Sequence, residues 1–253
     1  MCYTCHDADG PAATNIQAQF ALASRHNVSS VDQADGSRVE CTNCHDPHKV
    51  GPADRLIDPD SRQVWTGGAK AFCLKCHDGA PPAGVSFPTS APGVRFDKSS
   101  FAGTTHDTQL GADSCRYCHA MHGSPNVAIL EQRYVVNDYN PYTAGDGDYA
   151  ACWSCHGENR IMQQVNAFAD KHAKHVKDKA TPCIMCHEVH GGADPGEPGL
   201  IDMARPIARG GYDIHFIDGR DAGTSFWISA DTTRGNCYVS CHSVNHRPKE
   251  YVR

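Results

Sequence analysis

The apolar residues of this chain occur in short groups, and none of these groups approaches the roughly 18 consecutive residues that a membrane-spanning helix needs. Residues 212–217 and 224–230 are rich in β-branched and aromatic side chains, and a polar, glycine-containing segment at 218–223 separates them. This pattern predicts a small β-hairpin near 212–230. The same stretch is also consistent with a surface loop or with a docking surface for a partner.

Elsewhere the composition indicates little regular structure. The 253 residues include 23 glycines and 15 prolines, and only 8% are aromatic. We therefore expect a fold that is mostly irregular coil, with short helices at the cysteine motifs described next. A chain of this kind needs more than its own side chains to fill an interior.

All 14 cysteines belong to seven copies of one motif, six of the form C-x-x-C-H and the last of the form C-x-x-x-C-H. The cysteine pairs are Cys2 and Cys5, Cys41 and Cys44, Cys73 and Cys76, Cys115 and Cys118, Cys152 and Cys155, Cys183 and Cys186, and Cys237 and Cys241. The histidines directly after them are His6, His45, His77, His119, His156, His187 and His242. C-x-x-C-H is the attachment motif of c-type haem, whose iron the histidine binds. Seven motifs with no cysteine left over predict seven covalently attached haem c groups.

Other roles for these cysteines explain the pattern less well. A structural zinc site takes four ligands, and it would not need a histidine after every cysteine pair. A disulfide framework has no use for these histidines, and a thioredoxin-like site uses one C-x-x-C rather than seven. With only about 36 residues per haem, the haems must supply much of the buried surface.

The motifs alternate between two kinds. The motifs at His45, His119 and His187 are extended to C-x-x-C-H-x-x-H by His48, His122 and His190, whereas those at His6, His77 and His156 are plain. A short apolar–acidic triplet follows each extended motif, at 56–58, 129–131 and 200–202. This periodicity predicts a single haem-organised domain over 1–253, with two-haem repeats at about 1–57, 58–131 and 132–202 and a half repeat at 203–253.

Nine histidines lie outside the seven motif positions. They are His26, His48, His106, His122, His172, His175, His190, His215 and His246. We expect most of them to be sixth ligands, so that each haem iron is held by two histidines. A histidine three residues after a proximal histidine lies on the same side of that haem, and the porphyrin blocks it from the opposite face. Such a histidine must therefore serve another iron.

The nearest other iron belongs to the same repeat, and this predicts a set of ligand pairs. They are His48 with His6, His122 with His77, His190 with His156, His26 with His45, His106 with His119, and either His172 or His175 with His187. For the seventh iron, bound by His242, the best candidate is His215, because His246 fails the same-side test. His246 and one of His172 and His175 are then surplus, either solvated or bound elsewhere.

The alternation of C-x-x-C-H with C-x-x-C-H-x-x-H resembles the doubled CXXCH class of multihaem c-type cytochromes. That class includes periplasmic and porin-embedded electron conduits and polymerising extracellular cytochrome nanowires. The resemblance implies bis-histidine haems in a continuous stacked row, and electron transfer as the function. For nanowire proteins it further implies that a histidine of one subunit binds an iron of the next. The seven motifs and the C-x-x-x-C-H spacing at Cys237 depart from that class.

Two kinds of function fit seven haems. If both axial sites of every iron are filled, no substrate reaches an iron, and the protein is an electron carrier rather than an enzyme. A multihaem reductase of nitrite or of a sulfur oxyanion would need one iron with an open face, and the seventh haem is the candidate. The surplus of histidines favours the carrier, with other redox proteins or extracellular electron acceptors as partners.

The attachment of c-type haem outside the cytoplasmic membrane predicts the location. We expect a secreted protein, extracellular or periplasmic or on the outer surface, made with a secretory segment that the printed sequence lacks. Haem motifs near both ends and the surplus histidines favour head-to-tail self-association into a filament over a soluble shuttle or a porin-embedded conduit. The formal net charge of −6, to which haem propionates add, disfavours nucleic-acid binding.

Overall fold

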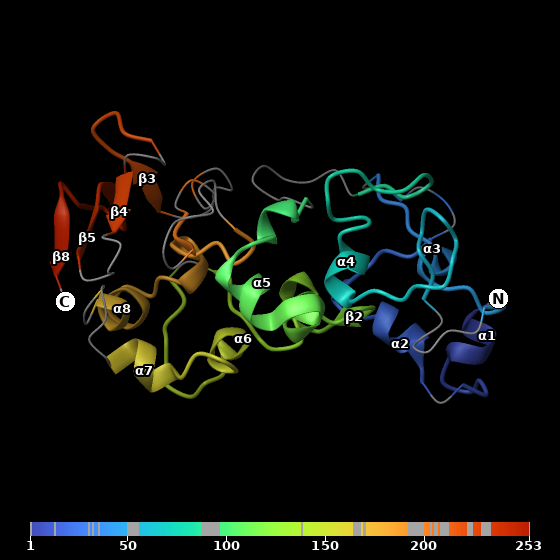
Figure 1. Cartoon of the computed structure of the whole chain (residues 1–253). Helices are drawn as coiled ribbons and strands as arrows, with labels where there is room; N and C mark the ends of the chain where they lie inside the picture. Colours follow the sequence, from blue (N-terminus) through green and yellow to red (C-terminus); the bar gives the residue numbers. More distant parts are fainter. Residues whose placement is uncertain are drawn as a thin grey trace. The chain divides into compact units, whose positions relative to one another are not determined.

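The computed structural model describes the chain except for residues 1, 13, 30, 32, 35, 50–55, 88–96, 138, 164–167, 169–170, 192–199, 203, 205–206, 208–212, 222–224, 229–233 and 253. The chain forms two compact units (Figure 1). The first comprises Met1–Ser90 and Arg95–Arg133, and the second comprises Ala91–Val94 and Tyr134–Arg253. The boundary after Arg133 lies close to the predicted end of the second repeat at residue 131. The division into two-haem repeats stays a prediction.

Short helices joined by coil make up the first unit. The α-helices are α1 (Tyr3–His6), α2 (Ile16–Phe20), α3 (Cys41–Cys44), α4 (Ala69–Cys73) and α5 (Thr105–Leu110), and the 3₁₀ helices are η1 (Ser99–Phe101), η2 (Gly111–Tyr117) and η3 (Val127–Ile129). Side-chain caps begin two of them: Asn15 accepts a hydrogen bond from the Ala18 amide, and Thr104 accepts one from the Asp107 amide. Strands β1 (Ser24–Arg25) and β2 (Gly123–Ser124) pair antiparallel.

The second unit adds two small sheets to its short helices. Its helices are α6 (Ala150–Trp153), α7 (Glu158–Gln163), α8 (Lys171–Ala173), the π-helical turn η4 (Lys174–Asp178) and the 3₁₀ helix η5 (Cys183–Met185). Its strands are β3 (Ile214–Phe216), β4 (Phe226–Ile228), β5 (Arg234–Cys237), β6 (Val239–Cys241), β7 (Val244–Asn245) and β8 (Lys249–Val252). Both sheets are antiparallel, with strand orders β3-β6-β7 and β4-β5-β8.

The hairpin predicted at 212–230 is wrong in its pairing. Strands form at both predicted places, but β3 pairs with β6 and β4 pairs with β5, so the two strands belong to different sheets. The reason is packing. Ile214 of β3 is 6% exposed and packs with Cys237 and Val239, which come later in the chain. Burial of this apolar face outweighs the local turn signal at 218–223.

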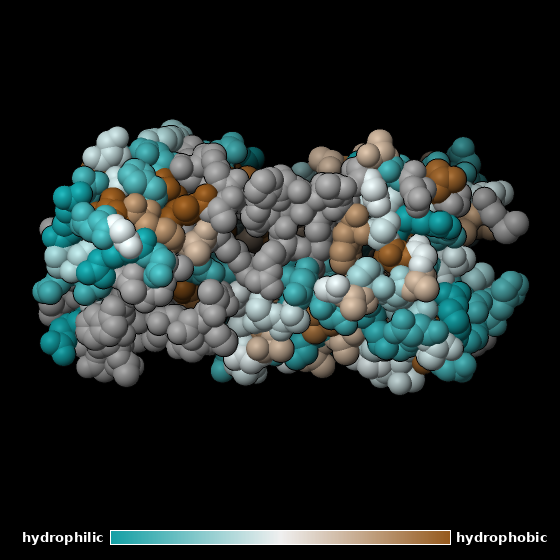
Figure 2. Space-filling model, turned by 90° about the horizontal axis from the view of Figure 1, so that it is seen from above, coloured by the Kyte–Doolittle hydropathy of each residue, from teal (hydrophilic) through white to brown (hydrophobic). Residues whose placement is uncertain are grey.

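The apolar core in each unit is small. Ile57, Phe72 and Phe101 are buried in the first unit, and Met185, Ile214 and Val239 lie together in the second. The face drawn in Figure 2 shows hydrophobic residues in small separate groups among hydrophilic ones. The mostly irregular fold with short helices is confirmed. In the described part of the chain, no helix has both the length and the apolar character needed to cross a membrane.

Candidate haem sites

Six of the seven cysteine motifs fold into the same turn. In each C-x-x-C-H motif the backbone N–H of the histidine donates a hydrogen bond to the carbonyl oxygen of the first cysteine. The N···O distances are 3.2 Å at His6, 2.9 Å at His45, 3.0 Å at His77, 3.0 Å at His119, 2.9 Å at His156 and 3.0 Å at His187. This turn puts both thiols and the imidazole on one short segment, as a haem bound through two thioethers and an axial nitrogen requires.

The first cysteines of successive motifs lie together in three places. Hydrogen bonds join the side chains of Cys2 and Cys41, of Cys73 and Cys115, and of Cys152 and Cys183. The bond between Cys73 and Cys115 raises the pKa of Cys73 and lowers that of Cys115 to about 7. Each pair joins a plain motif to the extended motif that follows it. The structure thus brings the two attachment sites of each predicted repeat into contact.

Polar contacts, one of them partly buried, hold the two motifs of the second predicted repeat together. Lys70 of α4 lies 2.5 Å from Asp107 of α5, whose side chain is 8% exposed. Burial raises the pKa of Asp107, but hydrogen bonds from Lys70 and from the Gly103 amide outweigh it and leave the pKa lowered. The amide of Ala69 donates to Asp113 of η2 at 3.0 Å. The helix of the third motif is therefore fixed against the segment that carries His106 and the fourth motif.

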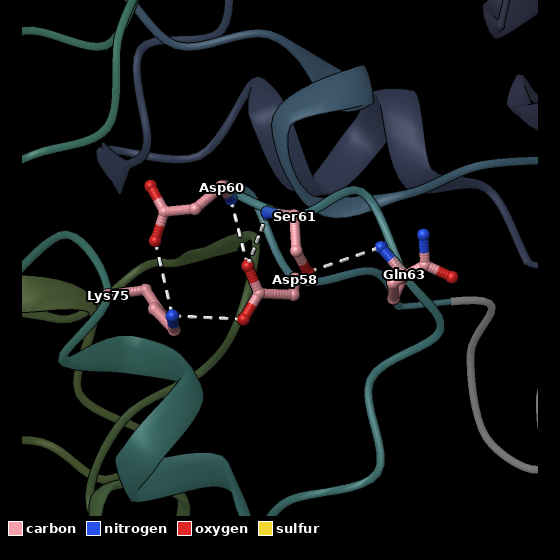
Figure 3. Close-up of polar contacts among 5 residues, drawn as sticks. All are labelled: Asp58, Asp60, Ser61, Gln63 and Lys75. Carbon is pink, nitrogen blue, oxygen red and sulfur yellow. Dashed lines mark hydrogen bonds and ion pairs between the residues drawn. The ribbon is translucent and has the colours of Figure 1, made fainter.

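An ion pair links the third motif to the chain segment that follows the second motif in the sequence. Lys75 lies 2.9 Å from Asp58 and 3.1 Å from Asp60 (Figure 3). Asp58 also accepts hydrogen bonds from the amides of Asp60 and Ser61, each at 2.9 Å. The Ser61 amide, followed by Lys75, lowers the pKa of Asp58 to about 2.

The apolar–acidic triplets pair with the extended motifs. Isolated antiparallel bridges join His45 to Leu56, His119 to Leu130 and His187 to Ile201. The next residue donates its amide to the carbonyl oxygen of the second cysteine in each case: Ile57 to Cys44, Glu131 to Cys118 and Asp202 to Cys186, at 3.0, 2.8 and 2.9 Å. Ile57 thus occupies the place of Glu131 and Asp202. The bridge thus falls on the first residue of the triplet at 56–58, but on the second residue of the triplets at 129–131 and 200–202.

Histidine rings lie in pairs at the spacing that a shared iron requires. Two imidazoles bound to one metal ion from opposite sides, through bonds of about 2.0 Å, have ring centroids about 6.3 Å apart. The centroid distances are 6.4 Å for His26 and His77, 6.1 Å for His45 and His122, 6.2 Å for His172 and His187, and 6.2 Å for His175 and His246. The pairs therefore fit bis-histidine haem iron.

Hydrogen bonds at Nδ1 orient several of the candidate ligands. Nδ1 lies 3.0 Å from the Met121 carbonyl in His26, 2.9 Å from the Ala128 carbonyl in His119, 3.1 Å from the Gln19 amide oxygen in His122, 2.7 Å from the Lys171 carbonyl in His175, and 3.3 Å from the Glu188 carboxylate in His190. When Nδ1 donates to an oxygen, Nε2 is the nitrogen that can bind a metal ion. These side chains are arranged as axial ligands are in metalloproteins.

Two histidine rings lie beside rings of another predicted repeat. His26 lies beside His77 and His122 lies beside His45, whereas the prediction paired His26 with His45 and His122 with His77. The cause is the antiparallel pairing of β1 with β2, in which the His26 amide donates to the His122 carbonyl at 3.3 Å. His26 directly follows β1, and His122 directly precedes β2. The strand pairing therefore brings each histidine close to a motif of the other predicted repeat. Which iron each of these histidines binds stays a prediction.

Close packing fixes the β1–β2 pairing. A Cβ added at Gly123 would overlap the carbonyl oxygen of Gln19 in α2. Gln19 also holds the His122 ring through its side chain, and Phe20 packs edge-on against that ring at 5.3 Å. Glycine after His122 therefore lets α2 approach β2, and α2 in turn positions the imidazole.

Both His172 and His175 lie beside another histidine ring, and the choice between them as ligand stays a prediction. His172 faces His187, as the prediction for the sixth haem allowed, and His175 faces His246. Burial, together with the neighbouring His187 and His175, lowers the pKa of His172 to about 4. The neutral imidazole is the form that binds a metal ion.

The structure places the remaining candidate sixth ligands in turns, on a helix and on a strand. His215 is exposed in β3, because its neighbours Ile214 and Phe216 turn toward the apolar cluster and alternate side chains point to opposite faces. Its role as the sixth ligand of the seventh iron stays a prediction. His48 is exposed, and His106 lies on α5. Both stay predicted ligands, as does His190.

The donor set suits haem rather than a bare metal ion. None of the 14 cysteines forms a disulfide. No group of three or more His, Cys, Asp or Glu side chains among the described residues is arranged to hold a metal ion. Haem iron takes four nitrogens from the porphyrin, so two histidines complete its coordination.

The comparisons with known proteins give one match. Residues 34–81 and 108–161 match the family model of the doubled CXXCH motif. Each matched segment runs from an extended motif to the next plain one, and is therefore out of phase with the predicted repeat, which runs from plain to extended. No curated protein and no solved structure matches the chain. The two matched segments carry the doubled CXXCH motif and, together with the six motif turns, are consistent with a multihaem c-type cytochrome.

Proposed function

We propose that this cytochrome is an electron carrier with seven bis-histidine haems, and that it catalyses no reaction at iron. The observation that carries the proposal is the spacing of the histidine pairs at 6.1 to 6.4 Å. An iron with two imidazoles has no site left for a substrate. The haem supplies the redox chemistry, and the chain supplies attachment, axial ligands and spacing.

Contact between attachment sites supports transfer from haem to haem. The cysteine pairs Cys2–Cys41, Cys73–Cys115 and Cys152–Cys183 bring successive motifs together. His26 precedes the second motif and lies beside His77 of the third, and His122 extends the fourth motif and lies beside His45 of the second. Ligands shared in this way would tie the haems of the second, third and fourth motifs together. A stacked row of haems follows naturally from such links.

Electron paramagnetic resonance of the oxidised protein tests the carrier proposal. Seven bis-histidine irons give only low-spin ferric signals, quantified against a haem count from intact mass. A high-spin ferric signal from one haem or more in the resting protein would instead support a reductase of nitrite or of a sulfur oxyanion.

We further propose that the protein is secreted, works in extracellular electron transfer and associates head to tail into a filament. Two exposed groups in the first unit support this. The first attachment site is exposed at Cys2, Cys5 and His6. His48 is also exposed, although it occupies the same place after its motif as His122, which faces an iron site outside its own repeat. An exposed histidine and an exposed haem site are what a neighbouring copy would engage.

Electron microscopy of the purified holoprotein tests assembly, with His48→Ala as the variant and His215→Ala as a matched control for an exposed histidine. The proposal predicts filaments for the unmodified protein and the control, and shorter or no filaments for His48→Ala. Monodisperse monomers at high concentration would contradict it, and would favour a soluble shuttle or a porin-embedded conduit.

A further inference from the structure

The fourth and sixth motifs share one backbone arrangement. The residue directly after each motif histidine donates its amide to the apolar–acidic triplet that follows: Ala120 to the Ile129 carbonyl at 2.8 Å, and Glu188 to the Leu200 carbonyl at 2.7 Å. Both acceptor residues are left-handed, with a φ of 56° at Ile129 and of 55° at Leu200. The side chains of Ala120 and Glu188 therefore occupy equivalent places in the two motifs.

The carboxylate of Glu188 reaches the second histidine of its motif. Its Oε1 accepts a hydrogen bond from the His190 amide at 3.0 Å and lies 3.3 Å from Nδ1 of the His190 ring. The side chains of Glu188 and His190 are 16% and 26% exposed, so water screens this contact only partly. With Nδ1 held toward the carboxylate, Nε2 is the nitrogen left to bind a metal ion.

The fourth motif has no carboxylate at this place, and a distant segment supplies the oxygen instead. The Nδ1 of His122 lies 3.1 Å from the side-chain amide oxygen of Gln19 in α2. Backbone carbonyls lie at Nδ1 of three further histidines, His26, His119 and His175. Of these five acceptors, only the one at His190 carries a negative charge.

A charged acceptor at Nδ1 changes the iron that the ring binds. An imidazole that donates its Nδ1 proton to a carboxylate is a more basic ligand through Nε2 than one that donates to a neutral oxygen. A more basic ligand and a nearby negative charge both stabilise ferric iron more than ferrous iron. The reduction potential of the haem is therefore lowered.

We propose that Glu188 is a positioning residue that lowers the reduction potential of the haem whose iron His190 binds. It acts through the His190 ring, by fixing the orientation of the ring and increasing its basicity. An electron on this haem then has a larger driving force to move to a neighbouring haem, so one carboxylate makes the haems unequal in potential. The inference rests on the proposed bis-histidine cytochrome, with His190 as a sixth ligand.

Removal of the charge tests the proposal. The variant is Glu188→Gln, whose side chain has the same length and still accepts from the His190 amide. The matched control is Asp46→Asn, because Asp46 also directly follows its motif histidine and its side chain accepts from the His48 amide at 3.0 Å. Both holoproteins are checked for an unchanged haem count by intact mass and titrated spectroelectrochemically. We expect one haem per chain to move to higher potential in Glu188→Gln, and a smaller shift in Asp46→Asn, where the described contact is to the backbone of the histidine and not to its ring.

The reverse change is Gln19→Glu, which places a carboxylate beside Nδ1 of His122. One haem per chain should then move to lower potential, and this variant decides the matter if Glu188→Gln is recovered with fewer haems. The proposal is overturned if Glu188→Gln shifts no haem further than Asp46→Asn does, or if Gln19→Glu lowers no potential.

His190→Ala separates a failure of this inference from a failure of the proposed carrier. A high-spin iron in the unmodified protein counts against the carrier. His190→Ala should add one high-spin ferric haem per chain, because a sixth ligand is lost. If every iron of this variant stays low-spin, His190 is not a ligand and the role of Glu188 is refuted, while the bis-histidine carrier stands.

Discussion

At the scale of single residues, His26 and His122 are the candidate ligands whose neighbours lie outside their own predicted repeats. Their rings lie beside His77 and His45, and in each case Nδ1 lies within hydrogen-bonding distance of an oxygen of the protein. Both histidines adjoin the short β1–β2 pairing, which therefore positions both candidate ligands.

His122→Ala is expected to open the iron bound by His45, and to leave the irons of His77 and His119 six-coordinate. The haem count stays the same because no cysteine changes, while one ferric haem per chain becomes high-spin. A crystal structure of the holoprotein variant identifies which iron is five-coordinate. An open iron at His77 would restore the pairing within repeats and contradict this expectation. His26→Ala is the complementary variant, and it should open the iron of His77.

Asp58→Asn should destabilise the cytochrome at neutral pH and have less effect in acid. The folded pKa of Asp58 is about 2, below its unfolded value of about 3.9. Its contribution to stability is therefore complete above pH 4 or so and is lost as the pH falls toward 2. The measurement is the difference in midpoint of thermal unfolding between the variant and the unmodified protein from pH 6 to pH 3. Asp60→Asn is the control, because Asp60 is more exposed and receives one contact from Lys75. A difference that grows on acidification would contradict this account.

What the sequence could predict at this scale follows from covalent spacing. The two cysteines and the histidine of a motif are neighbours in the chain, so their joint role needs no tertiary information. The choice of sixth ligand does. The same-side argument predicts that His122 serves an iron other than that of His119, but only the pairing of residues about a hundred positions apart brings its ring beside His45.

At the scale of elements, the packing of α4 against η2 holds two attachment sites together. A Cβ at Gly68, directly before α4, would lie 2.6 Å from the carbonyl oxygen of Ala112 in η2. The φ of Gly68 is −75°, so an alanine there is unfavourable for steric reasons alone.

Gly68→Ala is therefore expected to lower the free energy of unfolding by about 1–3 kcal/mol, the usual range for overpacking. The matched control is Gly157→Ala, where the nearest heavy atom, the Cβ of Arg160, is 3.7 Å away. That variant should stay within about 0.5 kcal/mol of the unmodified protein. Denaturant unfolding of the two holoproteins makes the comparison, and equal stability would show that α4 and η2 can separate without cost.

Local sequence patterns predict some elements of this fold but not how its strands pair. The helical turns at the motifs could be predicted because each is completed within five residues. The strands at 214–216 and 226–228 were recognisable from their β-branched and aromatic residues, but their partners were not. Strand β5 ends at the first cysteine of the seventh motif and β6 ends at the second, and nothing in the attachment motif itself predicts strand structure there.

At the scale of the whole molecule, we expect the haems to form part of the interior. Buried apolar side chains are few among the described residues, and coil dominates both units. Replacing the 14 cysteines by serine should therefore give a chain that is unfolded by circular dichroism in both the far and near ultraviolet. A compact, cooperatively unfolding apoprotein would show that the polypeptide core suffices alone.

Intact mass of the natural holoprotein should exceed that of the polypeptide by seven haems of about 616 Da each. A gain of six would indicate that the unusual C-x-x-x-C-H motif carries no haem. The family match leaves this count open, since it covers the second to fifth motifs.

Carbon monoxide binding tests the central claim most directly. If every iron in the resting cytochrome carries two protein imidazoles, no axial site is open to carbon monoxide. The reduced holoprotein at neutral pH should therefore show no rapid spectral change when carbon monoxide is added. Rapid formation of a carbon monoxide complex at one haem or more would mean that an axial site is open, and would contradict the assignment of this protein as an electron carrier.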